Sequence, residues 1–348
     1  MPRPPILLLL ALGSVHAQTK GPLPVNPADA KNQPTGKEAP PADPGLARYG
    51  IYAESAPFPV KGEAVVTKLP LKLEKGDRIA LVGNGLFEQA GRYGVLEAMI
   101  YQAHPDLDLF IRNFAWSGDE VDLQPRPDNF ATVAQHLARE KIDVVFAAFG
   151  FNESFGGGDK VDAFKVRLAN YLGELKTSAF NGKTGPRIVL ISPVALEGTD
   201  DSVNERLALY TTAMAEVADR EGVAFVDAFT PTRPALLDVS ADLSDNGLHL
   251  NEAGYRLFAR EVFQTLFEES PPDVSEKLRA VVVDLNRQYF RRYRPLNTFY
   301  YTGDRNKDYG YLDFLPAMRN FEMMAMNREA RVHVLARGEK VVGPVDDS

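Results

Sequence analysis

The residues of this chain that are best suited to chemistry stand in four short blocks of glycine, asparagine, serine and acidic residues. The last block ends in His249, and an imidazole can form hydrogen bonds and act as a general base. Amide side chains and the N–H groups of tight glycine turns can bind the oxygen atoms of a ligand. The blocks are Gly83-Asn84-Gly85-Leu86, Asn113-Phe114-Ala115-Trp116-Ser117-Gly118, Gly150-Phe151-Asn152-Glu153 and Asp245-Asn246-Gly247-Leu248-His249.

The elements that must position these blocks follow from the hydrophobic pattern. Short apolar runs precede the first three blocks, and helical periodicity separates the runs, which predicts the α/β class with a parallel sheet covered on both faces. Five buried strands are expected at 79–82, 109–111, 144–147, 188–191 and 224–226. Helices are expected near 88–103, 128–140, 159–180, 202–221 and 252–268, the last capped by Asn251. Ligands of such sheets bind beyond the carboxyl ends of the strands.

Taken together, the four blocks resemble the SGNH hydrolase superfamily, the GDSL-like lipases, acylhydrolases and esterases, in their order, spacing and positions at strand ends. The resemblance covers roughly residues 76–268. It implies a three-layer α/β/α flavodoxin-like sandwich with about five parallel strands. In that family the first block is Gly-Asp-Ser-Leu and carries the nucleophile. The second block supplies a glycine, the third is Gly-x-Asn-Asp, and the last is Asp-x-x-His.

The first three blocks keep donor positions of the family but lack its nucleophile. The nucleophile position corresponds to Gly85, which has no side chain and cannot form an acyl-enzyme. The resemblance implies that the N–H groups of Gly85 and Ala115 and the side chain of Asn152 hold an oxyanion. It places Asn84 with them in the substrate-binding set. The alternative for Asn152 is that its amide only ties two loops together.

In the last block, His249 stands directly before a capped amphipathic helix, which makes this the most specific match. Three positions earlier is Asn246, where the family has Asp, and Asp245 stands one position further back. An amide cannot stabilise an imidazolium ion by charge, and exchanging the triad Asp for Asn lowers kcat about 10⁴-fold in a serine protease. Asp245 either replaces the missing carboxylate or is a solvated loop residue, and the sequence leaves both open.

The resemblance thus implies an ester hydrolase for acyl or acetyl esters of carbohydrates or lipids, impaired because removal of a catalytic serine lowers kcat about 10⁶-fold. Two routes would restore activity: a hydroxyl from Ser117, Ser154 or Ser244, or attack by a water that His249 activates as general base. The alternative is a catalytically silent, carbohydrate-binding pseudo-esterase. A structural surface protein is a third, weaker interpretation.

Composition narrows the range of partners. The formal net charge is −8, and no run of Lys or Arg is long enough to follow a phosphate backbone, so nucleic acid is not expected. The expected partner is a small-molecule or glycan ester. No cofactor and no metal are expected, because the chain has 0 Cys and its His, Asp and Glu residues lack metal-site spacing. The oligomeric state is not defined by the sequence.

The sequence divides into four segments. Residues 1–17 are interpreted as a signal peptide, because Arg3 precedes an apolar run over 6–12 and small residues stand before Gln18. We therefore expect export to the periplasm or the cell exterior, with no membrane-spanning segment after cleavage. A Pro-rich linker, an SGNH-type domain and a C-terminal helix with an aromatic-rich appendage are expected over 18–60, 61–270 and 271–348. The appendage residues that are candidates to reach the site are Asn297, Tyr300 and Arg305.

Overall fold

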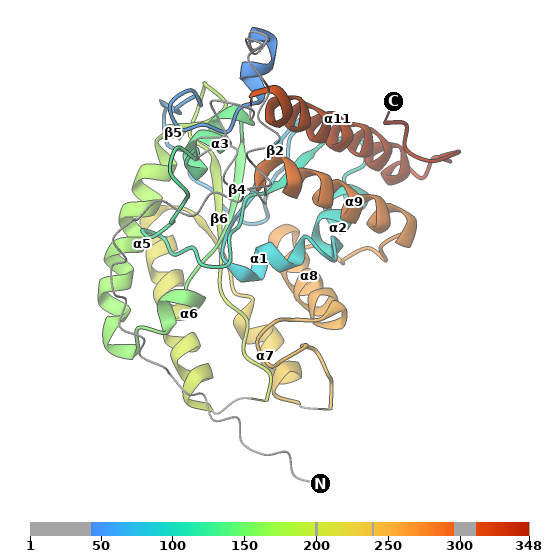
Figure 1. Cartoon of the computed structure of the whole chain (residues 1–348). Coiled ribbons are helices and arrows are strands. Elements are labelled where there is room, and N and C mark those ends of the chain that lie inside the picture. The colour runs from blue at the N-terminus through green and yellow to red at the C-terminus, as the bar shows by residue number, and fades with distance from the viewer. Residues whose placement is uncertain (1–42, 199–200, 239, 296–310, 348) are drawn as a thin grey trace, which may run out of the picture. The chain divides into compact units, whose positions relative to one another are not determined.

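The structure, a computed structural model, describes residues 43–198, 201–238, 240–295 and 311–347. These residues belong to one compact unit, which spans Ala42–Ser348. A five-stranded parallel sheet lies at its centre (Figure 1). Its strands are β2 (Arg78–Gly83), β3 (Phe110–Asn113), β4 (Val144–Ala148), β6 (Arg187–Ile191) and β7 (Ala224–Val226).

The strands lie in the order β3-β2-β4-β6-β7, and every neighbouring pair is parallel. Counted along this sheet alone, the order is 2-1-3-4-5, which is the flavodoxin-like arrangement. The central strand β4 is buried along its whole length, as expected for a parallel sheet with helices on both faces. The predicted α/β class and the five parallel strands are confirmed.

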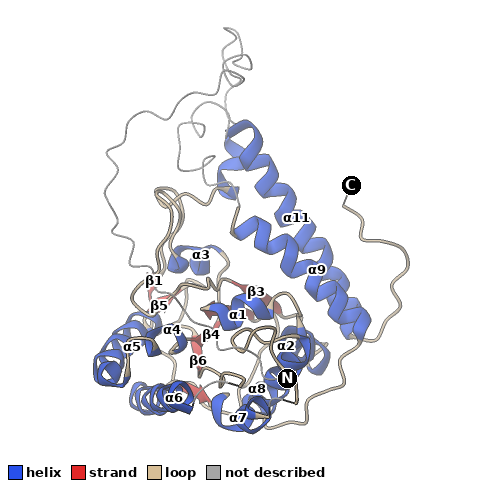
Figure 2. Cartoon of the chain, turned by 60° about the horizontal axis from the view of Figure 1, so that its bottom comes forward, coloured by secondary structure: helices blue, strands red, loops and turns tan. Residues whose placement is uncertain are grey.

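Helices cover both faces of the sheet (Figure 2). On one face, α5 (Val161–Lys176) packs against α6 (Asp201–Glu221), and on the other α2 (Val95–Ala103) packs against α8 (Glu252–Phe267). Shorter helices connect these elements: α1 (Gly85–Ala90), α3 (Val133–Arg139), α4 (Phe151–Ser154), the 3₁₀ helix η3 (Gly158–Lys160) and α7 (Phe229–Leu237). Strands β1 (Val60–Lys61) and β5 (Ser178–Ala179) form a separate antiparallel pair. The three-layer sandwich is therefore also confirmed.

Two helices differ from their predicted ranges for local reasons. The helix expected near 88–103 is divided into α1 and α2, because Gly94 adopts a left-handed conformation with φ of 61° between them. A Cβ on Gly94 would also lie 3.0 Å from Val282 of α9 (Glu276–Tyr293). Helix α3 begins later than expected, after Thr132, which forms a capping box with Gln135.

The folded unit extends beyond the predicted domain at both ends. Tyr49 and Ile51 lie within the predicted linker but are buried in the common core, and Pro44–Tyr49 form the 3₁₀ helix η2. At the other end, α9 packs on β3 and on α11 (Tyr311–Ala336), a long helix that was not predicted. Core side chains of both helices, such as Tyr289 and Val332, belong to the same hydrophobic cluster as the sheet. The C-terminal helices are thus part of the unit rather than an appendage to it.

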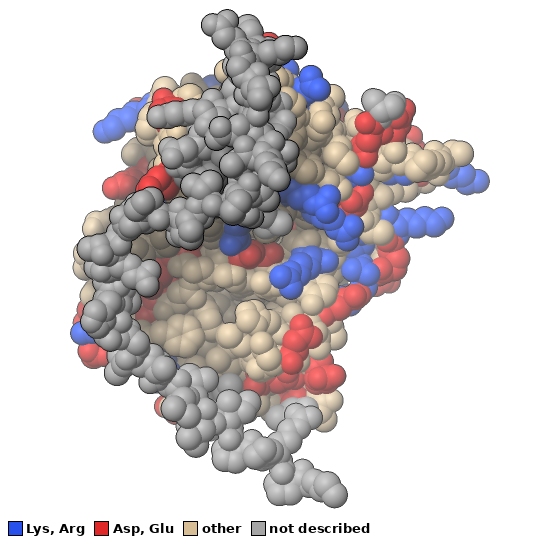
Figure 3. Space-filling model, in the orientation of Figure 1, with Lys and Arg blue, Asp and Glu red and all other residues tan. Residues whose placement is uncertain are grey.

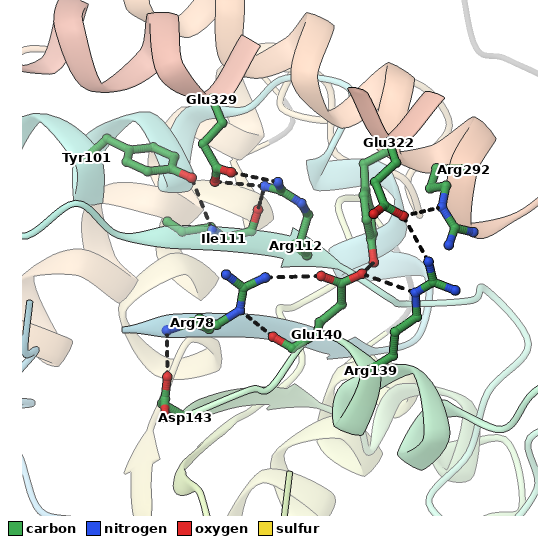
Figure 4. Close-up of polar contacts among 11 residues, drawn as sticks. Arg78, Tyr101, Ile111, Arg112, Arg139, Glu140, Asp143, Arg292, Glu322 and Glu329 are labelled. Carbon is green, nitrogen blue, oxygen red and sulfur yellow. Dashed lines mark hydrogen bonds and ion pairs between the residues drawn. The ribbon is translucent and has the colours of Figure 1, made fainter. Parts of the chain in front are cut away.

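Ion pairs join these C-terminal helices to the edge of the sheet (Figure 4). Arg112 on β3 is 2% exposed and donates to both carboxylate oxygens of Glu329 on α11, at 3.0 and 2.9 Å. Glu322 on α11 accepts from Arg139 of α3 and from Arg292 of α9, each at 2.9 Å. Because a bidentate pair constrains orientation as well as distance, Arg112 and Glu329 set how α11 lies on β3.

Some predicted features lie outside the described residues. These are the signal peptide, the first part of the Pro-rich linker, and the site candidates Asn297, Tyr300 and Arg305. Within the ranges that the structure describes, no helix is both long enough and apolar enough to cross a membrane.

Candidate active site

The loops that follow β2, β3 and β4 and the loop that precedes α8 surround one cavity at the carboxyl ends of the strands. Its volume is about 250 Å³, and Gly85, Asn152 and His249, predicted from three separate blocks, all line it. Its other lining residues are Leu86, Ser117, Phe151, Phe155, Pro193, Val194, Leu196, Leu248, Leu250 and Tyr255. The wall is therefore mostly apolar. The face drawn in Figure 3 has a hollowed, uncharged area bordered by acidic and basic side chains.

The first block turns the chain from β2 into α1. Gly83 must be glycine, because a Cβ there would lie 2.0 Å from the carbonyl oxygen of Ala148 on β4. Asn84 is buried, and its Oδ1 caps α1 by accepting from the N–H of Leu86 at 3.4 Å. It is not among the described residues that line the cavity. The structure therefore gives Asn84 a capping role instead of the substrate contact expected from the sequence.

Gly85 is the first residue of α1, so its N–H is one of the donors that a helix start leaves without an intrahelical acceptor. The position also has room for a side chain. Outside its own helix and its chain neighbours, the described atom nearest to a Cβ at residue 85 would be Oγ of Ser117, at 3.9 Å. Packing therefore does not exclude a serine here.

In the second block, Ser117 lines the cavity and Ala115 does not. Ala115 is buried, and its N–H donates to Oδ1 of Asn113 at 3.0 Å. It lines a neighbouring cavity of about 290 Å³ between α1 and α9. The N–H that was expected to hold an oxyanion is therefore already bonded and lies in a different cavity. Trp116 packs against Phe130, with ring centroids 5.8 Å apart.

Asn152 in the third block lies at the cavity, but its amide holds two segments of a loop together. Its Nδ2 donates to the carbonyl oxygens of Ser117 and Asp119, both at 2.9 Å. A side-chain amide has two N–H donors, so both are engaged. This is the loop-tying alternative, and donation to an oxyanion would require one of these bonds to break.

Glu153, beside Asn152, is a buried carboxyl group that stabilises the turn after β4. The residue is 3% exposed, and its carboxylate accepts from the N–H groups of Val121 at 3.0 Å and Gly150 at 2.8 Å. Gly150 itself has a φ of 89°, and a Cβ there would lie 2.7 Å from Sδ of Met214. Burial raises the pKa of Glu153 from 4.5 to about 7, although the hydrogen bonds from the backbone oppose this shift.

This carboxyl group is expected to make stability depend on pH. Between pH 4.5 and about 7 the folded chain keeps the proton on Glu153 while the unfolded chain has lost it. The contribution of Glu153 to the free energy of unfolding should be complete below pH 4.5 and fall by up to about 3 kcal/mol as the pH rises to about 7. Urea unfolding across this range checks it, with Glu153→Gln as the control that lacks the slope. Equal slopes for both proteins would contradict the prediction.

Asn246 determines the tautomer of His249, which is exposed at the cavity. Oδ1 of Asn246 accepts from the N–H groups of Leu248 and His249, at 3.1 and 2.9 Å. Its Nδ2 therefore faces the ring and donates to Nδ1 of His249 at 3.1 Å. A neutral ring that accepts at Nδ1 carries its proton on Nε2. A triad needs the opposite tautomer, with Nδ1–H held by a carboxylate and Nε2 free to take a proton.

Asp245 does not take the place of the missing carboxylate in this arrangement. Its N–H donates to the carbonyl oxygen of His249 at 2.9 Å, and among the described residues no hydrogen bond joins its carboxylate to the imidazole. The loop is held instead by Glu197, whose carboxylate accepts from the N–H of Leu243 at 2.7 Å and from the hydroxyl of Ser244. The structure thus brings His249 together with Asn246 and not with the Asp245 side chain.

One polar group beside the cavity was not predicted as a unit: Ser117 lines this cavity, and Glu88 lines the neighbouring one of about 290 Å³. Ser117 donates both its N–H and its hydroxyl to Oε2 of Glu88 in α1. Oε1 of Glu88 accepts from Arg294, just beyond α9, at 2.8 Å. The Arg294 guanidinium lies over the ring of Trp116, 4.0 Å from its centroid. The sequence carries no local signal for this group, because Ser117 is 29 residues from Glu88 and Arg294 is 206 residues from it.

The cavity therefore offers a ligand the hydroxyl of Ser117, the N–H of Gly85 and the Nε2–H of His249 within an apolar wall. These groups suit an ester, whose carbonyl oxygen accepts hydrogen bonds and whose acyl chain is apolar. Among the described residues, no group of three or more His, Cys, Asp or Glu side chains is arranged to hold a metal ion.

The strand order and the loops that meet at the carboxyl ends of the strands are those expected of the SGNH hydrolases. Residues 77–257 match the model of the GDSL-like Lipase/Acylhydrolase family. The chain belongs to this family, as the four sequence blocks predicted, and so falls within the ester hydrolases.

Solved structures resemble the chain in fold. One, described as a GDSL-like lipase from Parabacteroides merdae, is 17% identical, with a TM-score of 0.46 and coverage of 57% of this chain and 99% of that one. Another, a catalytic mutant of an acetylxylan esterase from Geobacillus stearothermophilus, is 19% identical, with a TM-score of 0.48 and coverage of 58% and 100%. No curated protein is significantly similar to the chain in sequence.

Proposed function

We propose that this chain binds acyl or acetyl esters of carbohydrates or lipids in the cavity and hydrolyses them slowly. The observation that carries the proposal is the convergence of Gly85, Ser117 and His249 on one cavity of about 250 Å³. The apolar wall, which includes Phe151 and Leu196, suits a short acyl chain. Turnover is slow because the position that carries the nucleophile in the family is Gly85.

The hydrogen-bond donors at the cavity support a role in stabilising the oxyanion. An ester carbonyl gains negative charge on its oxygen in the transition state, and donors already in place around that oxygen lower the barrier. His249 offers Nε2–H and Gly85 offers its N–H at the start of α1. A neutral imidazole polarises a carbonyl in this way in triosephosphate isomerase. We therefore assign His249 to donating a hydrogen bond, in place of the general-base role expected from the sequence.

Replacement of His249 tests this assignment. We expect His249→Ala to lower kcat for p-nitrophenyl acetate and for acetylated oligosaccharides about 10²-fold, because loss of one oxyanion donor typically costs this much. KM should change little, since the bond strengthens mainly in the transition state. His249→Gln, which keeps an N–H donor, is the matched control and should retain part of the activity. Wild-type rates in His249→Ala would show that His249 does not stabilise the oxyanion.

Export is part of the same proposal, and it rests on the N-terminal pattern of Arg3, an apolar run and small residues before Gln18. The mature protein recovered from the periplasm or culture medium of a secreting host should begin at Gln18. Recovery from the cytoplasm with Met1 intact would contradict it.

A second candidate function is a binding protein that recognises the same esters without turning them over. It is favoured by two observations, the missing side chain at Gly85 and the donation from Asn246 that keeps His249 from acting as a base. Calorimetric titration with acetylated oligosaccharides separates the two functions. If the wild-type protein bound these oligosaccharides and released no acetate, it would be a binding protein and not an esterase.

A further inference from the structure

We propose that Ser117 is the nucleophile of this chain and that Glu88 is its general base, a pair that replaces the missing serine and its histidine. This inference rests on the proposed ester hydrolysis and names the residues that carry it. Ser117 lies in the loop after β3, whereas the family places its nucleophile after β2, so the new nucleophile would enter the same cavity from the neighbouring strand.

The Ser117 hydroxyl lies close to where the family's nucleophile would be. Ser117 lines the cavity together with Gly85 and His249, and it is exposed. Its Oγ lies 3.9 Å from the point that a Cβ on Gly85 would occupy. The hydroxyl therefore stands beside the place from which a serine at residue 85 would act, close to the same donors.

The three serines of the site loops differ in burial and in hydrogen-bond partners. Ser154 is buried, and its hydroxyl donates to the carbonyl oxygen of Phe151 at 2.7 Å. Ser244 is also buried, and its hydroxyl donates to Glu197. Neither is among the described residues that line the cavity. Of these three hydroxyls, only that of Ser117 combines a carboxylate partner with access to a ligand.

Glu88 lies between Ser117 and Arg294 and contacts both side chains. An activated serine needs a base within hydrogen-bond reach and a third group that orients the base. Oε2 of Glu88 accepts the hydroxyl of Ser117, and Oε1 is held by Arg294 at 2.8 Å. Arg294 is itself placed by the rings of Trp116 and Phe290, whose centroids lie 4.0 and 5.5 Å from its guanidinium. The three side chains thus form a chain of nucleophile, base and positioning residue.

The reaction balances with these groups and water alone. Oγ of Ser117 attacks the ester carbonyl carbon while its proton passes to Oε2 of Glu88, and the oxyanion that forms accepts from Nε2–H of His249. The bond to the alcohol oxygen then breaks, and the leaving alcohol takes the proton from Glu88. Water attacks the acyl-serine and gives its proton to Glu88. Release of the carboxylic acid returns that proton to Ser117.

The test compares Ser117→Ala with Ser240→Ala, which removes another exposed serine hydroxyl that donates to a carboxylate, that of Asp238, but does not line the cavity. Each protein is assayed with p-nitrophenyl acetate and treated with an alkyl fluorophosphonate, which phosphonylates an activated serine with loss of fluoride. We expect wild type and Ser240→Ala to gain one adduct by intact mass, located in the peptide that contains Ser117. Ser117→Ala should gain none and lose at least about 10²-fold in kcat. Thermal unfolding confirms that each variant is folded.

Two further variants separate the base from its positioning residue. Glu88→Gln should lower kcat as strongly as Ser117→Ala. Arg294→Gln should lower kcat with KM unchanged, and Arg294→Lys, which keeps the charge, should recover part of the loss. A purely structural role for Arg294 would not give this recovery in kcat.

The outcomes distinguish this inference from the proposed function. If folded Ser117→Ala hydrolysed esters at the wild-type rate while His249→Ala did not, ester hydrolysis would stand and Ser117 would not be the nucleophile. If wild type neither hydrolysed any of the esters nor reacted with the fluorophosphonate, both the proposed function and the inference would be overturned.

Discussion

In a protein that already carries Ser117→Ala, the double variant Gly85→Ser/Asn246→Asp should hydrolyse p-nitrophenyl acetate with a kcat about 10³-fold or more above that of Ser117→Ala alone. This background is used so that only the serine at residue 85 can act as the nucleophile. In serine hydrolases, loss of the serine costs about 10⁶-fold and exchange of the triad Asp for Asn about 10⁴-fold, so repairing both positions should recover a large part of this difference.

The structure gives each change a separate physical reason. Outside its own helix and its chain neighbours, a Cβ at residue 85 would meet no described atom closer than Oγ of Ser117 at 3.9 Å, so packing does not exclude a serine there. An aspartate at residue 246 can keep one oxygen on the N–H groups of Leu248 and His249, now held by Oδ1 of Asn246 at 3.1 and 2.9 Å. Its other oxygen replaces the Nδ2 donor and must accept from Nδ1–H. The proton then moves from Nε2 to Nδ1, and Nε2 becomes a base.

The single variants and a steric control complete the experiment. Gly85→Ser alone should gain much less than the double variant, because His249 keeps a proton on the nitrogen that must accept one. Asn246→Asp alone should gain little, since no hydroxyl stands at residue 85. Gly85→Ala/Asn246→Asp fills the same space without a hydroxyl and should match Asn246→Asp. A double variant no faster than this control would show that the cavity cannot support the family's triad.

The fold was predictable because strand burial and helix periodicity leave direct marks on the sequence. The five apolar runs that precede polar loops correspond to the five strands, and β4 is apolar throughout because helices cover both of its faces. Asn251 was recognisable as a cap because an asparagine before an amphipathic pattern has a local effect, and it accepts from the N–H of Gly254 at 3.1 Å. Features that depend on neighbours within a few residues were therefore predicted well.

The candidate site was predicted less well, because hydrogen-bond partners are set by the tertiary structure. Motif position placed Ala115 in the oxyanion set, but Asn113 two residues earlier already accepts its N–H. The contact of Ser117 with Glu88 joins the loop after β3 to helix α1, which follows β2, and the two strands lie side by side only once the sheet has formed. No local pattern marks such a pair. Its third member, Arg294, comes from a segment that has no counterpart in the family motifs.

The packing of the C-terminal helices on the sheet was not predicted, for a related reason. Arg112 stands at the end of an apolar run, and charged residues are rarely fully buried, so no local pattern marks it as a buried residue. In the structure it is buried only because α11, far along the chain, supplies Glu329 as a bidentate partner. Charged residues on edge strands are commonly exposed, so the sequence does not reveal that another helix covers Arg112.

Breaking this buried pair should destabilise the protein strongly. We expect Glu329→Met to lower the free energy of unfolding by about 3–5 kcal/mol, because it leaves the guanidinium of Arg112, which is 2% exposed, without its carboxylate. Urea unfolding at neutral pH measures the loss. The exposed pair of Arg337 and Glu339, just beyond the end of α11, is the matched control. Glu339→Met should lower the free energy of unfolding by less than about 1 kcal/mol.

The double variant Arg112→Met/Glu329→Met distinguishes lost charge compensation from lost packing. It should recover most of the stability, because two apolar side chains of similar volume remove the unpaired charge and still fill the space between β3 and α11. A double variant as unstable as Glu329→Met would instead show that the lost stability comes from lost packing.

The same pair is expected to affect the candidate active site. Since α11 packs on α9 and α9 leads directly to Arg294, Glu329→Met should loosen the contact of Arg294 with Glu88 and lower ester turnover, and the double variant should restore both.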